Sequence, residues 1–196
     1  MNLRSSLCVL FVLALSTAGL AESVQSKRVS GLENAVILII RHAEKPDTGH
    51  SLSPAGETRA DACASYFANF VIDGRQLKLD HIFATRDTRH SHRPRLTVEP
   101  TAQKFGLPID DRFKNKQFLK LVDEIKSWPH GEDVLISWHH GKIPQLLRAL
   151  GADPQKLLPN GKWPDSSFDW LIQLRYDQNG RLMESKRVDA CAISSR

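Results

Sequence analysis

The sequence lacks the features that mark several classes of protein. It has no polybasic arm, no zinc finger and no strip of interleaved basic and aromatic residues, so nothing in it favours a nucleic-acid partner. It contains no internal repeat and no low-complexity tract, and beyond the first 21 residues no apolar run is long enough to cross a bilayer. What remains is the composition of an ordinary globular domain, with 41% hydrophobic and 25% charged residues among 196. We therefore expect one domain that can bury a sizeable core without disulfides or a metal.

The first 21 residues have the organisation of a secretory signal peptide. Arg4 supplies a positive start, an apolar run follows from Leu7 to Leu15, and small residues lead to Ala21. A short membrane anchor is the alternative, but the run is shorter than the roughly 18 residues that a membrane span needs. We expect cleavage of residues 1–21 and export, with a bacterial periplasm as the compartment. The mature protein is then expected to have no stable membrane insertion, a flexible lead-in at residues 22–33 and a folded domain at 34–196.

Cleavage changes both the charge and the number of cysteines. It removes Arg4 and no acidic residue, so the formal charge falls from +5 to +4, a mildly basic balance that suits anionic substrates. It also removes Cys8 and leaves Cys63 and Cys191. These two cysteines could form a disulfide in an oxidising compartment, or Cys63 could be a small buried residue on a helix. The sequence alone does not decide between these readings.

Periodicity predicts strands that alternate with helices. A helix is expected to begin with Ser53 as N-cap and Pro54 as its first residue, and to end at Asp73-Gly74. Its apolar positions are Ala60, Cys63, Ala64, Phe67 and Val71. The expected strands are Ala35 to Ile40, His81 to Thr85, Asp133 to Trp138, Phe168 to Tyr176 and Arg181 to Val188, and further helices carry apolar faces at 98–105, 118–125 and 143–150. This order indicates a three-layer α/β/α domain with a mainly parallel sheet.

The unusual polar residues follow two of the predicted buried strands. One strand runs directly into Arg41-His42, and the other runs into His139-His140. Because the carboxyl ends of parallel strands share one edge of a sheet, these side chains are expected to lie together. A neutral imidazole is a nucleophile that can hold a phosphoryl group, and a guanidinium binds phosphoryl oxygens with paired donors. A salt-bridge cluster with Glu44 is the structural alternative for Arg41 and His42.

Three segments resemble the histidine phosphatase superfamily, which has the phosphoglycerate-mutase-like fold. "ILIIRHAEKP" followed by "LSPAGETRA" resembles its opening signature, in which a strand ends in Arg-His and a helix start follows. "SHRPRLTVEPTAQKFGL" resembles its Ser-x-x-Arg-x-x-x-Thr-x-x-x-Ala stretch in looser form. "DVLISWHHGKIPQLLRALG" resembles its strand-His-Gly-helix segment. All three stand in family order between about Ala35 and Gly151.

The resemblance implies a phosphatase that hydrolyses phosphomonoesters or phosphoramidates of small molecules through a phosphohistidine. His42 would attack phosphorus, while Arg41, Arg93 and His140 would bind the phosphoryl oxygens. No metal or other cofactor is expected, and the four histidines at 81, 90, 92 and 130 lack a tight helical pair of ligands. Arg86, Arg89 and Arg95 in the same predicted loop are alternatives to Arg93 as the second phosphate-binding arginine. His139 is the alternative to His140.

The chain also departs from the family pattern. Ala43 stands where many members carry glycine, and Asn115 stands near the position where the proton-donating glutamate would be sought. Gly141 follows His140, so the His-Asp pair of the acid-phosphatase branch is missing. The candidates for the leaving-group acid are Glu44, His139 and Asp169, unless the substrate is a phosphohistidine or acyl phosphate that needs little protonation.

Two other functions fit the same residues. One is a catalytically silent phosphate-binding module, and the other is a phosphatase specific for an envelope sugar phosphate. Activity on simple esters would separate enzyme from binder, and a substrate panel would separate broad from narrow specificity. The sequence indicates neither the substrate nor the oligomeric state.

Overall fold

The computed structural model describes residues 31–193. The predicted signal peptide at residues 1–21 lies outside this range, as does the predicted lead-in before residue 31. Residues 31–33 belong to a turn rather than to a flexible lead-in, and Leu32 is only 5% exposed because it packs in the core. The packed domain therefore includes these three residues. No helix within 31–193 is long and apolar enough to cross a membrane.

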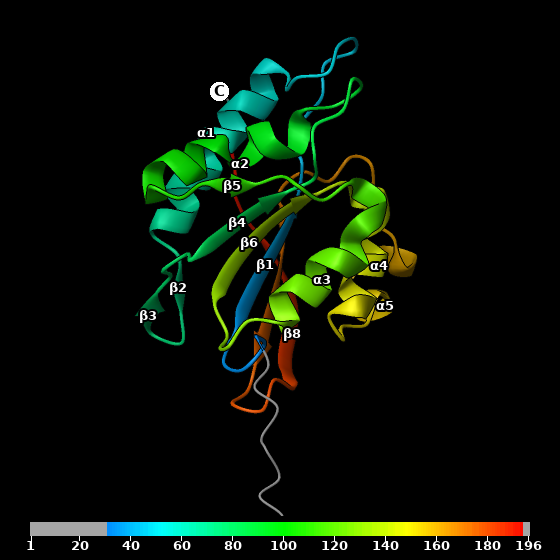
Figure 1. The fold of residues 1–196 in the computed structure, drawn as a ribbon. Helices are drawn as coiled ribbons and strands as arrows, with labels where there is room; N and C mark the ends of the chain where they lie inside the picture. Colours follow the sequence, from blue (N-terminus) through cyan, green and yellow to red (C-terminus); the bar gives the residue numbers. More distant parts are fainter. Residues whose placement is uncertain (1–30, 194–196) are drawn as a thin grey trace, which may run out of the picture.

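A six-stranded sheet forms the centre of the domain, in the order β5-β4-β6-β1-β7-β8 (Figure 1). Its strands are β1 (Val36–Arg41), β4 (His81–Ala84), β5 (Ile109–Asp110), β6 (Asp133–Trp138), β7 (Trp170–Tyr176) and β8 (Leu182–Asp189). β5, β4, β6 and β1 are parallel, whereas β7 and β8 run antiparallel to them. The sheet is thus mainly parallel, as predicted, and the two late strands form the expected hairpin.

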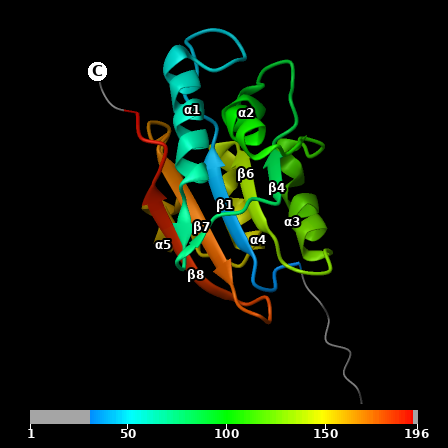
Figure 2. The same cartoon turned by 90° about the vertical axis from the view of Figure 1, so that its left-hand side faces the viewer.

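Helices cover both faces of the sheet (Figures 1 and 2). The helices are α1 (Pro54–Ala68), α2 (Arg93–Phe105), α3 (Phe118–Lys126), α4 (Ile143–Ala149) and α5 (Pro154–Leu157), with short 3-10 turns η1 (Asn115–Gln117), η2 (His140–Lys142) and η3 (Pro159–Gly161). Along β1, Leu38 and Ile40 pack with α1 and α2, whereas Ile37 and Ile39 pack with α3 and α4. This alternation of buried side chains on a fully buried strand makes the three layers.

The predicted start of α1 is confirmed, but its predicted end is wrong. The Ser53 side chain accepts a hydrogen bond from the Gly56 backbone N–H at 3.1 Å, and Pro54 is the first helical residue. The helix ends at Ala68, and Val71 is 59% exposed in a two-residue strand, β2 (Val71–Ile72), that pairs with β3 (Arg75–Gln76). The reason is the Asp73-Gly74 pair, which takes positive φ angles of 52° and 72° and forms a hairpin turn.

A disulfide joins Cys63 of α1 to Cys191, which follows β8. The two residues are 128 positions apart in the sequence, and their Cα atoms lie 4.4 Å apart. The sequence left this pairing open, and the structure resolves it. The bond ties the chain after the last strand to the helix that follows β1.

Candidate active site

The register of the sheet brings the two histidine segments together. Arg41 pairs with Trp138 across β1 and β6, and the His42 backbone N–H donates to the Trp138 carbonyl oxygen at 3.3 Å. The next residues therefore leave the sheet side by side. The ring centroids of His42 and His139 are 5.5 Å apart, and those of His42 and His140 are 6.1 Å apart.

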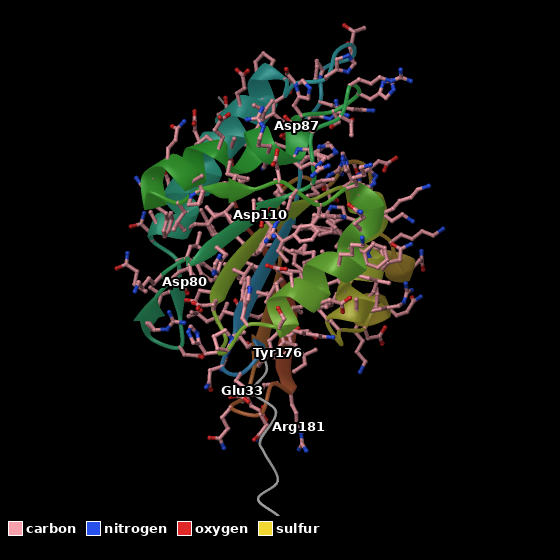
Figure 3. All side chains as sticks on the ribbon, in the orientation of Figure 1. Glu33, Asp80, Asp87, Asp110, Tyr176 and Arg181 are labelled. Carbon is pink, nitrogen blue, oxygen red and sulfur yellow. A yellow bond between two sulfur atoms is a disulfide. The ribbon has the colours of Figure 1, made fainter. Side chains whose placement is uncertain are left out.

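This cluster lies at the carboxyl edge of the parallel strands. Figure 3 labels Asp87, which follows β4 by three residues, at one end of the molecule, and Tyr176, the last residue of antiparallel β7, toward the other end. The carboxyl ends of β1, β4 and β6 point toward the Asp87 end (Figure 1). The structure therefore brings Arg41-His42 and His139-His140 together at one edge of the sheet, as predicted.

His42 is held in one tautomer by its own backbone. Its Nδ1 lies 2.7 Å from the carbonyl oxygen of Ala43. Because a carbonyl oxygen can only accept, Nδ1 carries the hydrogen of the neutral ring, and Nε2 keeps its lone pair. Burial, with smaller contributions from Arg41, His139 and Arg93, lowers the pKa of His42 to about 3. The imidazole, which is 4% exposed, is therefore neutral at neutral pH.

The Ala43 peptide that orients His42 is itself fixed. The Ala43 backbone N–H donates to Thr97 Oγ1 at 2.9 Å, and the Thr97 hydroxyl donates to the Arg93 carbonyl oxygen at 2.8 Å. The Ala43 methyl is fully buried in a small apolar cluster with Leu52 and Ala60. This packing explains why alanine is accommodated where the resemblance led us to expect glycine.

Arg41 is bound by the loop that precedes β7. Its Nη1 donates to the carbonyl oxygens of Pro164 at 3.0 Å, Asp165 at 2.9 Å and Ser167 at 3.2 Å. Its guanidinium carbon also lies 4.0 Å from the centre of the Phe168 ring. Burial lowers the pKa of Arg41 to about 10, so the group stays charged at neutral pH. Arg41 Nε is buried and has no hydrogen-bond partner within residues 31–193.

Among the arginines at 86, 89, 93 and 95, Arg93, the first residue of α2, is the one whose charge contributes, after burial, to the low pKa values of His42 and His139. Burial lowers the pKa of Arg93 as well, and its buried Nε has no hydrogen-bond partner in the described chain. The rivals are engaged elsewhere or exposed: Arg95 pairs with Asp87 and Glu99, Arg89 donates to His90, and Arg86 is exposed.

His140 carries a carboxylate partner that the sequence analysis missed. Its Nε2 lies 2.8 Å from Asp165 Oδ1, while its Nδ1 is buried without a hydrogen-bond partner among the described residues. Burial, followed by the charge of Arg41, lowers the pKa of His140, and Asp165 opposes that shift. Asp165 lies in an irregular loop more than twenty residues after His140, so no periodic pattern could have indicated it.

Comparisons with known proteins identify the fold. A scan against protein-family models and a search of curated proteins each gave no match. Among solved structures, a phosphoglycerate mutase from Plasmodium falciparum is 19% identical, with 76% of this chain and 89% of that chain covered at a TM-score of 0.51. The chain therefore has a phosphoglycerate-mutase-like fold.

Two mycobacterial structures resemble this fold to a similar degree. A glucosyl-3-phosphoglycerate phosphatase is 15% identical, with 81% of this chain and 99% of that chain covered at a TM-score of 0.50. A protein described as mycobacterial hydrolase 1 is 17% identical, with 80% and 100% covered at a TM-score of 0.50. At these identities the likeness establishes the architecture and leaves the chemistry to the residues of this chain.

The three candidates for the leaving-group acid differ in their surroundings. The Glu44 carboxylate is bound by Arg59, whose Nη2 and Nε donate at 2.6 and 2.8 Å. No hydrogen bond or ion pair within residues 31–193 joins the Asp169 carboxylate to the site, and its backbone carbonyl oxygen accepts from Ala190. His139 alone lies against His42, and burial, then the charge of Arg93, lowers its pKa to about 4.

Asn115 also comes to this edge of the sheet. The Trp138 indole N–H donates to the Asn115 carbonyl oxygen at 3.3 Å, and Asn115 Oδ1 is buried without a partner among the described residues. An amide therefore stands in the segment where the histidine-phosphatase pattern led us to seek a glutamate. Within residues 31–193, no group of three or more His, Cys, Asp or Glu side chains is arranged to hold a metal ion.

Proposed function

We propose that this protein is a phosphatase that hydrolyses phosphomonoesters or phosphoramidates through a phosphohistidine on His42. The observation that carries the proposal is the Nδ1 contact of His42 with the Ala43 carbonyl oxygen, which leaves Nε2 as the nucleophilic atom. Arg41 and Arg93 supply fixed positive charge beside it, as transfer of a phosphoryl group requires.

The reaction takes two steps at the same phosphorus. In the first, His42 Nε2 attacks phosphorus, the bond to the leaving group breaks, and that group departs with the electron pair. In the second, water attacks the phosphohistidine, phosphate leaves, and the neutral imidazole is restored. Because the His42 ring is already neutral at neutral pH, no base is needed to activate it.

His140 and Asp165 complete the group that holds the phosphoryl oxygens. The Asp165 carboxylate accepts from His140 Nε2 and opposes the lowering of the His140 pKa by burial and by Arg41. In the protonated ring the buried Nδ1–H donates to a phosphoryl oxygen. We assign the leaving-group proton to no carboxylate, because Glu44 is bound by Arg59 and no hydrogen bond or ion pair among residues 31–193 joins the Asp169 carboxylate to the histidines. This arrangement suits leaving groups that depart with little protonation, such as aryl oxides or the imidazole of a phosphohistidine.

We also propose that the protein is exported, into a periplasm if its source is bacterial. The signal-like segment at residues 1–21 supports this assignment, and so does the Cys63–Cys191 disulfide, because such bonds persist in oxidising compartments. Specificity for an envelope sugar phosphate would be compatible with that location. A silent phosphate-binding module is disfavoured by the unblocked Nε2 of His42, because binding alone does not require a nucleophile.

The direct test is to trap the intermediate. The purified protein would be mixed with phosphorus-32-labelled p-nitrophenyl phosphate and quenched in alkali, which preserves a phosphohistidine, or in acid, which hydrolyses it. We expect alkali-stable label on the native protein and on His130→Gln, a control at an exposed histidine, and none on His42→Asn. Label that persists in His42→Asn would overturn the mechanism. Tight phosphate binding without hydrolysis would favour the silent module.

A further inference from the structure

A groove lies beside His140 and continues away from the phosphoryl site. It has a volume of about 380 Å³ and is formed where η2 and α4 face the segment around η3. Its lining includes His140, Gly141, Gln145, Arg148, Lys162 and Trp163. Because His140 belongs to both, a substrate held at His42 can extend into this groove with the part that becomes the leaving group.

The groove is lined by cations and by no carboxylate. Arg148 and Lys162 are the permanently charged residues of its lining. Both are exposed, and neither side chain makes a hydrogen bond or ion pair with any residue of the described chain. In contrast, the Arg95 and Arg112 guanidinium groups each contact two carboxylates. Two unpaired cations in one concave surface favour an anionic ligand.

The carboxylate that contacts His140 lies outside the lining of the groove. It belongs to Asp165, whose side chain is 92% exposed. Lys45 adds positive charge on the side of His140, because its charge contributes to the lowered pKa of that ring. Positive charge near His140 therefore comes from Lys45, in addition to Arg148 and Lys162 in the groove lining.

The spacing along the chain sets the length of a fitting ligand. Gly141, Gln145 and Arg148 are four and three residues apart, so they lie along one side of the η2–α4 segment. Seven residues of helix span roughly 10 Å. Long side chains on helices generally lean toward the N-terminus, which from Arg148 is the direction of His140. A ligand that reaches from His42 to Arg148 would therefore need only a short carbon chain.

We infer that this groove binds a second anionic group, a phosphate or a carboxylate, carried on the leaving group of the substrate. The inference rests on the proposed phosphatase function and names its substrate class as small bis-anionic phosphate esters. Arg148 and Lys162 are then specificity-determining residues that take no part in the chemistry at His42. A phosphate ester with a neutral leaving group would react at the same site without using them.

The test compares esters that differ only at the far end of one chain. The probes are hexyl phosphate, hexane-1,6-diyl bisphosphate, 6-phosphonooxyhexanoate and 6-aminohexyl phosphate. For the native protein we expect kcat/KM about tenfold higher for the bisphosphate than for hexyl phosphate, which corresponds to about 1.4 kcal/mol. Its two equivalent phosphates account for about a factor of two of that ratio by statistics alone. Comparison of 6-phosphonooxyhexanoate with the bisphosphate shows whether the groove prefers a carboxylate or a phosphate. We expect 6-aminohexyl phosphate, which carries a positive charge at its far end, to be the poorest substrate.

The variants show whether the two cations cause the preference. In Arg148→Gln/Lys162→Gln the ratio of kcat/KM for the bisphosphate to kcat/KM for hexyl phosphate is expected to fall to about the statistical factor of two. The kcat for p-nitrophenyl phosphate should be unchanged. Lys78→Gln removes an exposed charge before β4, and it should keep the native ratio. Sodium chloride at 0.5 M should weaken the preference in the native protein, because the cations are exposed. A ratio near two in the native protein, or one that survives in the double variant, would overturn the groove assignment.

Failure of the phosphatase proposal can be recognised separately. If the native protein hydrolyses neither p-nitrophenyl phosphate nor any chain probe, the proposed function fails. The groove is then tested by calorimetric titration with hexane-1,6-diyl bisphosphate and hexyl phosphate. Binding of the bisphosphate about tenfold tighter than that of hexyl phosphate, and dependent on Arg148 and Lys162, would support the groove; equal binding would overturn it.

Discussion

Nε2 of His140 and Oδ1 of Asp165 lie 2.8 Å apart at the carboxyl edge of the sheet. The same Asp165 presents its backbone carbonyl oxygen to Nη1 of Arg41 at 2.9 Å. One loop residue therefore contacts two of the groups that we assign to phosphoryl binding. It orients the imidazole through its side chain and the guanidinium through its main chain.

Removing the Asp165 charge should change the pH dependence of the proposed phosphatase activity. Asp165 raises the pKa of His140, against the lowering by burial and by Arg41, so Asp165→Asn lowers that pKa. For each unit by which it falls, the protonated fraction of His140 at neutral pH decreases about tenfold. We expect the alkaline limb of the kcat/KM profile for p-nitrophenyl phosphate to move to lower pH. Asp61→Asn, at an exposed position on α1, is the control, and an unmoved limb in Asp165→Asn would contradict this role.

The features that could be predicted from the sequence were mostly the regular strands and helices. The apolar runs that became β1 and β6 indicated two buried parallel strands, and topology then brought Arg41-His42 and His139-His140 to one edge. Asp165 lies in a loop whose path depends on tertiary packing, so no local pattern indicated it. The apolar spacing of α1 continues to Val71 by coincidence. That residue lies in β2, because Asp73-Gly74 forms the turn of the β2–β3 hairpin.

Periodicity also could not choose among neighbouring arginines around the start of α2. The resemblance selected Arg93 as the second phosphate-binding arginine, but the order of residues alone left Arg86, Arg89 and Arg95 as rivals. The start of α2 and the ion pairs of the other arginines determine which guanidinium lies near the histidines. Neither can be read from the order of residues. The Cys63–Cys191 bond depends on the folded chain in the same way, since 128 residues separate its ends.

Arg93 and Arg95 provide a matched pair of substitutions. Arg93→Ala removes a charge that acts on His42 and His139, and we expect kcat/KM for p-nitrophenyl phosphate to fall about a hundredfold. Arg95→Ala removes partly exposed ion pairs with Asp87 and Glu99 and should cost less than about 1 kcal/mol of stability, with little change in kcat/KM. Steady-state kinetics and urea unfolding of both variants check this contrast, and a larger kinetic loss in Arg95→Ala would reverse our assignment.

Glu44 is expected to matter for stability and not as an acid. Its carboxylate accepts from both Nε and Nη2 of Arg59, and a glutamine offers a single uncharged acceptor. Glu44→Gln leaves the buried guanidinium without its counter-charge, at a cost of about 1–3 kcal/mol in the free energy of unfolding. The pH profile of kcat should keep its shape. Glu57→Gln, at an exposed position of α1, controls for charge; loss of a pH limb in Glu44→Gln alone would reinstate Glu44 as the proton donor.

Reduction of the disulfide should lower stability. A bond between residues 128 positions apart removes much conformational freedom from the unfolded chain, and loss of such bonds typically costs about 2–5 kcal/mol. We expect a lower Tm for the native protein in reductant than without it. Cys63→Ser/Cys191→Ser should melt at the lower temperature in both conditions. Equal melting of the native protein with and without reductant would show that the bond does not contribute.

The pKa of His42 predicts how stability depends on pH. Burial lowers that pKa to about 3, whereas the same side chain in the unfolded chain titrates near 6.5. Below pH 6.5 the unfolded state binds a proton that the folded state does not. The free energy of unfolding should therefore decrease as pH falls from about 6.5 toward 3, by up to about 1.4 kcal/mol per pH unit for this group. His139, whose pKa is lowered to about 4, acts in the same direction.

Urea unfolding at pH 7.5, 6.0 and 5.0 measures this dependence. His42→Gln has no titrating group at this position, so its stability should fall less steeply between pH 6.0 and 5.0. His130→Gln, which alters an exposed histidine, should keep the native slope. Added phosphate should offset part of the loss in the native protein, because a bound anion favours protonated histidines beside it. Parallel slopes for His42→Gln and the native protein would mean that the His42 imidazole takes up its proton in the folded state as readily as in the unfolded one.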